Sequence, residues 1–275
     1  NNPSLSVRPE EGLLRMRKKL GLYANLRPTF TFESLLEMSP IKKSIVKGTD
    51  LIFVRELIGG IYFGKRGKSP ENDYAFDTCE YKKEEVERIA KIGFELARKR
   101  SKKLCCIDKA NVLETSRLWR KTVQSMERNY KDVEVSYEFV DAVAMRLIHS
   151  PNKYDVLITS NLFGDILTDE ASVISGSMGL MPSASIGSQT SVYEPIHGSF
   201  PEAKGKNIAN PLATILSASM MFERSFNLTK EAEMIRKIVS DSIEKKIVTE
   251  DLAENNKSFS TSQVGDWIKE RIEKE

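Results

Sequence analysis

The sequence predicts an α/β protein, in which strands and helices alternate along most of the chain. Segments with apolar residues at helical spacing alternate with short apolar runs that have the length of a buried strand. Strands joined through helices of this length need crossover connections, so part of the sheet should be parallel. A chain of 275 residues is long enough for one large domain or two smaller ones.

The expected elements are justified in order by their periodicity. Residues 84–100 place Val86, Ile89 and Phe94 on one helical face and charged side chains on the other. The expected helices are 84–100, 116–129, 211–224, 230–245 and 261–273, the last capped by Ser260 or Thr261. The expected strands are 51–57, 61–63, 104–107, 133–140 and 154–159.

Two segments interrupt the alternation. Gly59 and Gly60 separate the strands 51–57 and 61–63, which predicts a hairpin. Residues 67–70 should follow as a surface loop, and 176–191, rich in Gly and Ser without a clear period, should be mostly loop.

Charge and cysteine content exclude several classes of function. The chain has 42 Lys and Arg against 39 Asp and Glu, a net charge of +3, which does not indicate a nucleic-acid or membrane partner. Two histidines and three cysteines are too few for the usual zinc cluster, so oxygen ligands should hold any metal, which favours magnesium or manganese. Cys79, Cys105 and Cys106 are expected to be buried strand residues in a reduced cytoplasm. The longest apolar runs are shorter than the roughly 18 residues of a membrane span.

Three aspartates are candidates for a metal site. Asp165 and Asp169 are four residues apart where the strand 154–159 leads into a helix, so their carboxylates share one face. Asp141 follows the strand 133–140, at the sheet edge where α/β active sites gather. Together they would form an octahedral magnesium site. The alternatives are a solvated acidic face and the metal site of a magnesium-dependent phosphohydrolase.

Three arginines are candidates for binding an anionic substrate. Arg17, Arg27 and Arg55 lie in segments that otherwise look structured, and Arg55 interrupts an apolar strand, where a charge needs a partner. Because the guanidinium fork binds carboxylates in a bidentate way, convergence of the three would indicate a di-acid substrate. Taken singly, each arginine is more typical of a surface charge.

Two further side chains could carry protons. Lys109 follows the strand 104–107, where a desolvated amine beside a metal can act as a general base. The alternative is a loop lysine paired with Asp108. Tyr62 could donate its phenolic proton or could simply be a packing residue. His197 lies in a Gly/Pro loop whose backbone N–H groups could hold phosphate, and neither GxGxxG nor GxxxxGK[ST] occurs.

Six motifs occur in order, and together they resemble the β-decarboxylating dehydrogenases, the isocitrate/isopropylmalate dehydrogenase family. The resemblance runs from about residue 7 to the C-terminus. The motifs are RPEEGLLRMR (8–17), GLYANLRP (21–28), VRELIGGIYFG (54–64), DKANV (108–112), NLFGD (161–165) with Asp169, and EPIHGS (194–199).

The resemblance implies a two-domain α/β fold with a mixed parallel and antiparallel sheet. Residues 23–175 would form the domain with the dimer interface and the metal-binding helix, and 1–22 with 176–275 would form the cofactor-side domain. Family members begin with a strand and a turn like GDGIGPE. This chain contains neither, so it is expected to be N-terminally incomplete, without the first strands of the sheet.

The resemblance also implies an activity, the NAD-dependent oxidative decarboxylation of the di-acid 3-isopropylmalate to 2-oxoisocaproate in leucine biosynthesis. The site would be shared across a homodimer. The three arginines would clamp the substrate carboxylates. Asp165 and Asp169, with Asp141 of the partner subunit also near the substrate, would hold Mg²⁺ or Mn²⁺. Lys109 of the partner subunit would deprotonate the hydroxyl, and Tyr62 would protonate the enolate carbon. Alternatives are a sister enzyme for D-malate, tartrate or isocitrate, and a non-catalytic chain that only binds ligand or dimerises.

Substrate and cofactor preference follow from two segments of the resemblance. Leu13 and Leu14 offer an apolar surface for an isopropyl group, which favours isopropylmalate over isocitrate. Glu202 would accept the ribose 2′-OH and repel a 2′-phosphate, which favours NAD over NADP, although the nearby Lys204 departs from the commonest form of the loop, as do Phe200 and Ala203. The expected cofactor-binding residues are Glu10, His197, Gly198, Ser199, Glu202, Asn207, Ile208, Ala209 and Asn210.

Overall fold

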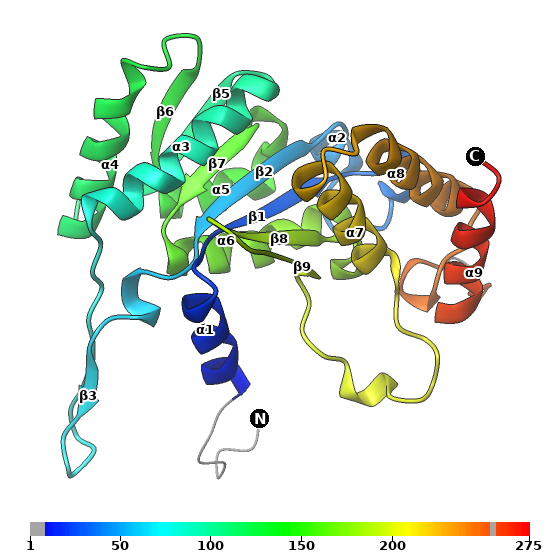
Figure 1. The fold of residues 1–275 in the computed structure, drawn as a ribbon, viewed down its shortest axis with the longest axis horizontal. Helices are drawn as coiled ribbons and strands as arrows, with labels where there is room; N and C mark the ends of the chain where they lie inside the picture. The colour runs from blue at the N-terminus through cyan, green and yellow to red at the C-terminus, as the bar shows by residue number, and fades with distance from the viewer. Residues whose placement is uncertain (1–8, 254–256) are drawn as a thin grey trace.

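A seven-stranded sheet runs through the molecule (Figure 1). The computed structural model describes residues 9–253 and 257–275, so Arg8 and the rest of residues 1–8 in the predicted 1–22 segment lie outside the described part. In sheet order the strands are β6 (Glu134–Phe139), β5 (Lys103–Asp108), β7 (Val156–Thr159), β2 (Asp50–Glu56), β1 (Leu22–Phe30), β8 (Pro182–Gly187) and β9 (Ser191–Pro195).

The sheet is mixed, as predicted. The four strands β6, β5, β7 and β2 pair in parallel, whereas β1 pairs antiparallel with β2 and β8, and β8 with β9. The helices that follow these strands in the chain are α3 (Lys83–Lys99), α4 (Glu114–Glu127), α5 (Val140–His149) and α6 (Asn161–Ser175), of which α3, α4 and α5 lead to the next parallel strand. The carboxyl ends of the parallel strands therefore meet at one edge of the sheet.

The two faces of the sheet differ in what covers them. Side chains alternate along β1 and β2, so Leu26 and Val54 face a core shared with α3 and α4, whereas Phe53 faces a core shared with α5 and α6. Arg27 pairs with Phe53 across the strands, and Arg55 lies two residues further along β2. Both arginines consequently lie on the α6 face.

A third apolar cluster holds the C-terminal helices together. It joins α7 (Leu212–Ser225), α8 (Thr229–Glu244) and α9 (Thr261–Ile272), for example through the buried Leu212, Ile238 and Val264. The predicted cap is confirmed, because the Ser260 hydroxyl accepts a hydrogen bond from the Gln263 backbone N–H at 3.3 Å. The remaining α-helices are α1 (Pro9–Lys19), which packs against β1, and the short α2 (Lys43–Val46).

The predicted hairpin at Gly59 and Gly60 is wrong. Residues Gly60–Tyr62 form a 3₁₀ turn instead of a strand. The ring of Tyr81 lies directly on both glycines, and a Cβ at Gly60, whose φ is +71°, would lie 2.4 Å from the Tyr81 hydroxyl oxygen. The two glycines therefore permit close packing of an aromatic ring, and they do not turn one strand back on another.

The hairpin lies further along the chain, where the sequence predicts a loop. Strands β3 (Arg66–Lys68) and β4 (Ala75–Asp77) pair antiparallel and project from the body of the molecule, on the same side as α1 (Figure 1). The exposed side chains of Tyr74 and Phe76 lie on this arm, with ring centroids 6.1 Å apart.

The prediction that residues 176–191 are mostly loop is also wrong, because β8 lies inside the sheet between β1 and β9. Ser183, Ala184 and Ser185 are all buried there, although they alternate between the two faces. Small side chains on both faces leave no hydrophobic period in the sequence, which explains why the strand was not predicted.

The three cysteines are free thiols, and two of them match the prediction. Cys105 and Cys106 are buried in β5, and burial raises the pKa of Cys105 to about 12. Cys79 contradicts the prediction, since it lies outside the strands and is exposed.

No helix within residues 9–253 and 257–275 is long and apolar enough to cross a membrane.

Candidate active site

Asp165 is the centre of a polar cluster on α6. Its carboxylate accepts hydrogen bonds from Arg55 Nη1 and, at 2.8 Å, from the Tyr62 hydroxyl. Arg27 Nη2 lies 3.9 Å from the same carboxylate. Residues from β1, β2, the 3₁₀ turn and α6 thus meet where the parallel strand β2 ends.

Arg55 is held rigidly by Asn161, a residue for which the sequence patterns predict no role. The Asn161 Oδ1 accepts hydrogen bonds from Arg55 Nε at 3.1 Å and Nη2 at 2.8 Å, and its Nδ2 donates to the Gly59 carbonyl at 3.0 Å. A Cβ at Gly164 would lie 2.6 Å from Arg55 Cγ, so glycine there lets α6 approach the arginine. In the sequence, only the single amide of Asn161, one helical turn before Asp165, could have indicated this contact with Arg55.

Arg27 is fixed by neutral oxygens and by Asp169. Its Nε donates to Asn25 Oδ1 at 2.6 Å, and its Nη1 donates to Thr168 Oγ1 at 2.6 Å and lies 3.4 Å from Asp169 Oδ1. Burial, and then repulsion from Arg55, lowers the pKa of Arg27 to about 10, so the side chain stays charged at neutral pH. The predicted pair Asp165 and Asp169 thus faces arginines, which supply the compensating charge.

Arg17 enters the same cluster from α1 and is only partly satisfied. Its side chain is buried, and its Nε has no hydrogen-bond partner within the described residues. Burial lowers the pKa of Arg17, repulsion from Arg55 lowers it further, and Glu194 and Asp165 oppose these effects. A buried guanidinium with an unpaired donor could bind an anion, since burial without a partner is unfavourable.

Leu13 and Leu14 lie one turn before Arg17 on α1. Leu13 is 36% exposed, and Leu14 is half-buried. An apolar surface consequently adjoins the unpaired arginine, on a helix that also carries the exposed Glu10.

The protonation of Tyr62 gives a testable prediction. Burial, reinforced by the hydrogen bond to Asp165, raises the pKa of Tyr62 to about 12. Because the folded-state pKa lies above the unfolded value of about 10, the stabilisation is complete below pH 10 and is lost as the pH rises toward 12. We expect the tyrosinate difference spectrum of wild type minus Tyr62→Phe to show a midpoint well above pH 10. A midpoint near pH 10 would contradict the buried hydrogen bond.

Lys109 and Asp141 form a separate pair at the ends of β5 and β6. The Lys109 amine donates to Asp141 Oδ1, and this hydrogen bond lowers the pKa of Asp141. The alternative pairing of Lys109 with Asp108 is wrong, because Asp108 is buried and accepts from Arg120 at 2.7 and 3.0 Å.

The three-aspartate metal site does not form within one chain. Over the described ranges, no group of three or more His, Cys, Asp or Glu side chains is placed to hold a metal ion. Asp165 and Asp169 point to arginines on the same chain, while Asp141 points to Lys109. The structure therefore brings together two of the three aspartates and leaves the third in another cluster.

The predicted cofactor residues from His197 to Asn210 form an extended loop after β9 (Figure 1). The end of this loop is anchored to α9: the Asn207 amide donates to Ser262 Oγ at 2.8 Å, and the Thr261 hydroxyl donates to the Ala209 carbonyl at 2.6 Å. Gly198, Ser199 and Glu202 are exposed. The loop thus has a fixed end, and its middle faces solvent except at the buried Ala203.

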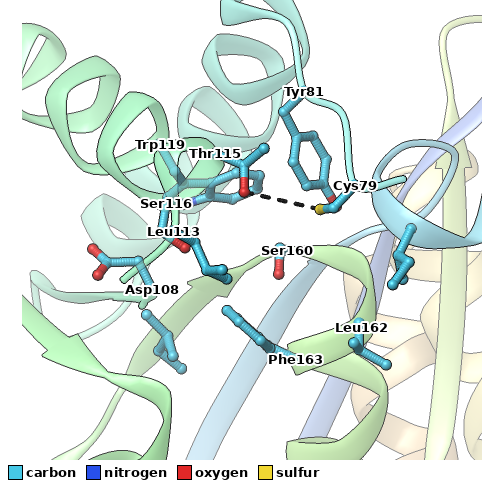
Figure 2. Close-up of a pocket in the computed structure, with 12 residues that line it drawn as sticks. Cys79, Tyr81, Asp108, Leu113, Thr115, Ser116, Trp119, Ser160, Leu162 and Phe163 are labelled. Atoms are coloured by element: carbon cyan, nitrogen blue, oxygen red, sulfur yellow. Dashed lines mark hydrogen bonds between the residues drawn. The ribbon is translucent and has the colours of Figure 1, made fainter. Parts of the chain in front are cut away.

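An apolar cavity of about 170 Å³ lies next to the start of α6 and is lined there by Ser160, Leu162 and Phe163 (Figure 2). It is enclosed by side chains that include Trp119, Phe163 and Tyr81. The Tyr81 hydroxyl accepts a hydrogen bond from the Asn161 backbone N–H at 2.9 Å, so one wall of the cavity is part of the network that positions Arg55.

Comparison with known proteins identifies the family. The family described as isocitrate/isopropylmalate dehydrogenase matches residues 2–268. A 3-isopropylmalate dehydrogenase of Bacteroides fragilis is 54% identical over 275 residues, which is 100% of this chain and 77% of that protein. One of Aquifex aeolicus is 49% identical over 278 residues, covering 100% of this chain and 76% of its own length.

A solved structure supports the same relationship. The crystal structure of isocitrate dehydrogenase from Methylococcus capsulatus has a TM-score of 0.89 and 33% sequence identity, and the match covers 99% of this chain and 79% of that one. The six motifs, the mixed sheet and these similarities agree, and the chain belongs to the isocitrate/isopropylmalate dehydrogenase family.

Proposed function

We propose that the protein catalyses the NAD-dependent oxidative decarboxylation of 3-isopropylmalate to 2-oxoisocaproate, a step of leucine biosynthesis. The observation that carries the proposal is the buried, incompletely paired Arg17 beside Arg27 and Arg55, which suits a substrate with two carboxylates. The Bacteroides and Aquifex relatives, both called 3-isopropylmalate dehydrogenase, support this substrate.

The substrate would be recognised both by its negative charges and by the shape of its isopropyl group. Arg17, Arg27 and Arg55 would bind the carboxylates, and the fixed hydrogen bonds of Arg27 and Arg55 would orient the substrate before reaction. Leu13 and Leu14 would contact the isopropyl group. An isocitrate carboxylate at that position would be buried against leucine, which favours the apolar substrate.

The donor set fits Mg²⁺ or Mn²⁺, because it consists of carboxylate oxygens. Asp165 and Asp169 would hold the ion with Asp141 of the partner subunit. When bound, such an ion acidifies the substrate hydroxyl and stabilises the enolate left by decarboxylation. Lys109 of the partner subunit would take the hydroxyl proton, and Tyr62, still protonated at neutral pH because its pKa is about 12, would deliver a proton to the enolate carbon.

The loop from His197 to Asn210, with Glu10 on α1, would bind NAD. The Glu202 carboxylate is exposed, and its role would be to accept the ribose 2′-OH and repel the 2′-phosphate of NADP. Gly198 has nothing within 4 Å of a Cβ position, so the backbone there is open to a ligand.

A homodimer with shared active sites is part of the proposal. Apolar side chains are exposed on α5 and α6, namely Met145, Ile148, Ile166 and Val173. Exposed apolar surface of this kind marks protein–protein interfaces. The interface would lie in a domain formed by residues 23–175, and 1–22 with 176–275 would form the other.

Three free thiols support a cytoplasmic location.

The test is the formation of NADH by the purified protein with 3-isopropylmalate, NAD and Mg²⁺. We expect turnover with this substrate, a strong preference for NAD over NADP, and loss of activity with a chelator. Turnover with D-malate, tartrate or isocitrate instead would assign a sister activity. Ligand binding by calorimetry with no turnover on any of them would favour the non-catalytic alternative.

A further inference from the structure

A second, larger cleft lies on the face of the sheet opposite the arginine cluster. Its volume is about 590 Å³, within the range of small-ligand sites. Pro28 and Ile52 form part of its floor, and their side chains alternate with those of Arg27 and Phe53, which point to the α6 face. The end of α3 forms one wall, and α7 and α8 form the other.

Basic side chains line both walls of this cleft and outnumber the acidic ones. Two carboxylates, Asp50 and Glu223, face four basic groups, Lys99, Arg100, Arg224 and Arg236. The apolar part of the lining includes Phe30, Leu216 and Met220. The cleft therefore combines positive charge with an apolar floor.

The two carboxylates of the cleft already form ion pairs with two of its arginines. Arg100 donates to Asp155 at 2.6 Å and to Asp50 at 2.9 Å, and Arg236 donates to Glu223 at 2.9 Å. For Arg224 and Lys99, no carboxylate of the described chain lies within ion-pair distance. The uncompensated charge of the cleft is thus divided between its two walls.

Arg224 is the basic side chain of the cleft whose hydrogen bonding is incomplete. It is half-buried, and its Nε is buried without a hydrogen-bond partner in the part of the chain that the structure describes. Burial lowers the pKa of Arg224, and repulsion from Arg100 and Arg236 lowers it further, against the opposing effect of Glu223. Three guanidinium groups therefore act on one another here, and an anion would satisfy the unpaired one.

We propose that this cleft binds a small dianion, carrying phosphate or carboxylate groups, which bridges Arg224 on α7 and Lys99 at the end of α3. Arg100 and Arg236 add to the positive potential, and the floor would accept a hydrocarbon portion. The site is distinct from the Arg17 cluster, because the sheet separates the two. Since α3 and α7 belong to the two domains proposed above, the ligand would connect both halves of the molecule on this face.

The test is calorimetric titration of the full chain with inorganic pyrophosphate and, separately, with succinate, in metal-free buffer. We expect at least one of them to bind saturably in an event that depends on Arg224, and which one binds distinguishes phosphate from carboxylate chemistry. Arg224→Gln should weaken binding by about ten-fold or more, since a charge-assisted hydrogen bond is lost. Arg128→Gln, which removes an exposed arginine at the end of α4, should leave it unchanged.

Arg17→Gln controls for binding at the active-site cluster: it should remove any binding event of that cluster and leave the Arg224-dependent event unchanged. The proposal is overturned if neither anion binds saturably, if Arg128→Gln weakens binding as much as Arg224→Gln, or if only Arg17→Gln weakens it. If Arg224→Gln does not fold by circular dichroism, Lys99→Gln replaces it, because Lys99 is exposed and the same loss of affinity is expected.

Discussion

Replacing Asp165 with asparagine should lower kcat/KM for 3-isopropylmalate by about 10³-fold. The amide keeps the size of the side chain and removes the charge on which three groups converge, Arg55 Nη1, the Tyr62 hydroxyl and the more distant Arg27. It also removes a proposed metal ligand. Steady-state kinetics at saturating Mg²⁺, with the melting temperature measured in parallel, separates a catalytic loss from a folding defect.

Two matched variants sharpen this prediction. Asp169→Asn should lower kcat/KM by about ten-fold, because the Asp169 side chain is 63% exposed and its only ion pair among the described residues, with Arg27, is 3.4 Å long. Asp266→Asn, at an exposed position on α9, should leave the kinetics unchanged. If Asp165→Asn keeps activity within ten-fold of wild type, Asp165 is not the centre of the site.

Lys109→Met should lower kcat by about 10³-fold, because the proposed general base is lost. We further expect that mixing two inactive chains, Lys109→Met and Asp165→Asn, restores about a quarter of wild-type activity. In a random mixture half of the dimers are heterodimers, and one of the two sites in each would combine the intact Asp165 of one chain with the intact Lys109 of the other. The measurement is NADH formation after joint unfolding and refolding.

The control is a mixture of Lys109→Met with Asp141→Asn. Lys109 and Asp141 pair within one chain, so both would be contributed to the same neighbouring site, and every heterodimer site would carry one of the two defects. This mixture should stay inactive. If it recovers as well as the first mixture, or if neither recovers while both variants still dimerise, the proposed division of the site between subunits is wrong.

Much of the fold could be predicted because its signals are local. The apolar face of α3 and the short apolar runs of β5 and β7 repeat with the period of their own element. The position of Asp165 where the strand 154–159 leads into a helix was predicted, but its ion pair with Arg55 is a finding of the structure. A charge inside an apolar strand was a second signal, since it required a partner.

What could not be predicted depends on contacts between distant segments. Gly59 and Gly60 resemble a turn until Tyr81, some twenty residues later, is seen to pack on them. The β3–β4 hairpin buries little of its surface, so it has no hydrophobic alternation to detect. The hydrogen bonds of Asn161 to Arg55 and Gly59 span more than 100 residues. A single amide in a helix carries no such information in the sequence.

The different anchoring of Arg55 and α1 has a consequence for how this enzyme could evolve. Arg55 is tied to Asn161, Gly164 and Asp165 on α6, so a change at any of these positions disturbs the others. Leu13 and Leu14 lie on a helix with few neighbours, where a substitution disturbs little else. New substrates should therefore arise through mutations of α1, while the reactive chemistry is inherited unchanged, and the substrate range of related enzymes should vary with the residues at these two positions.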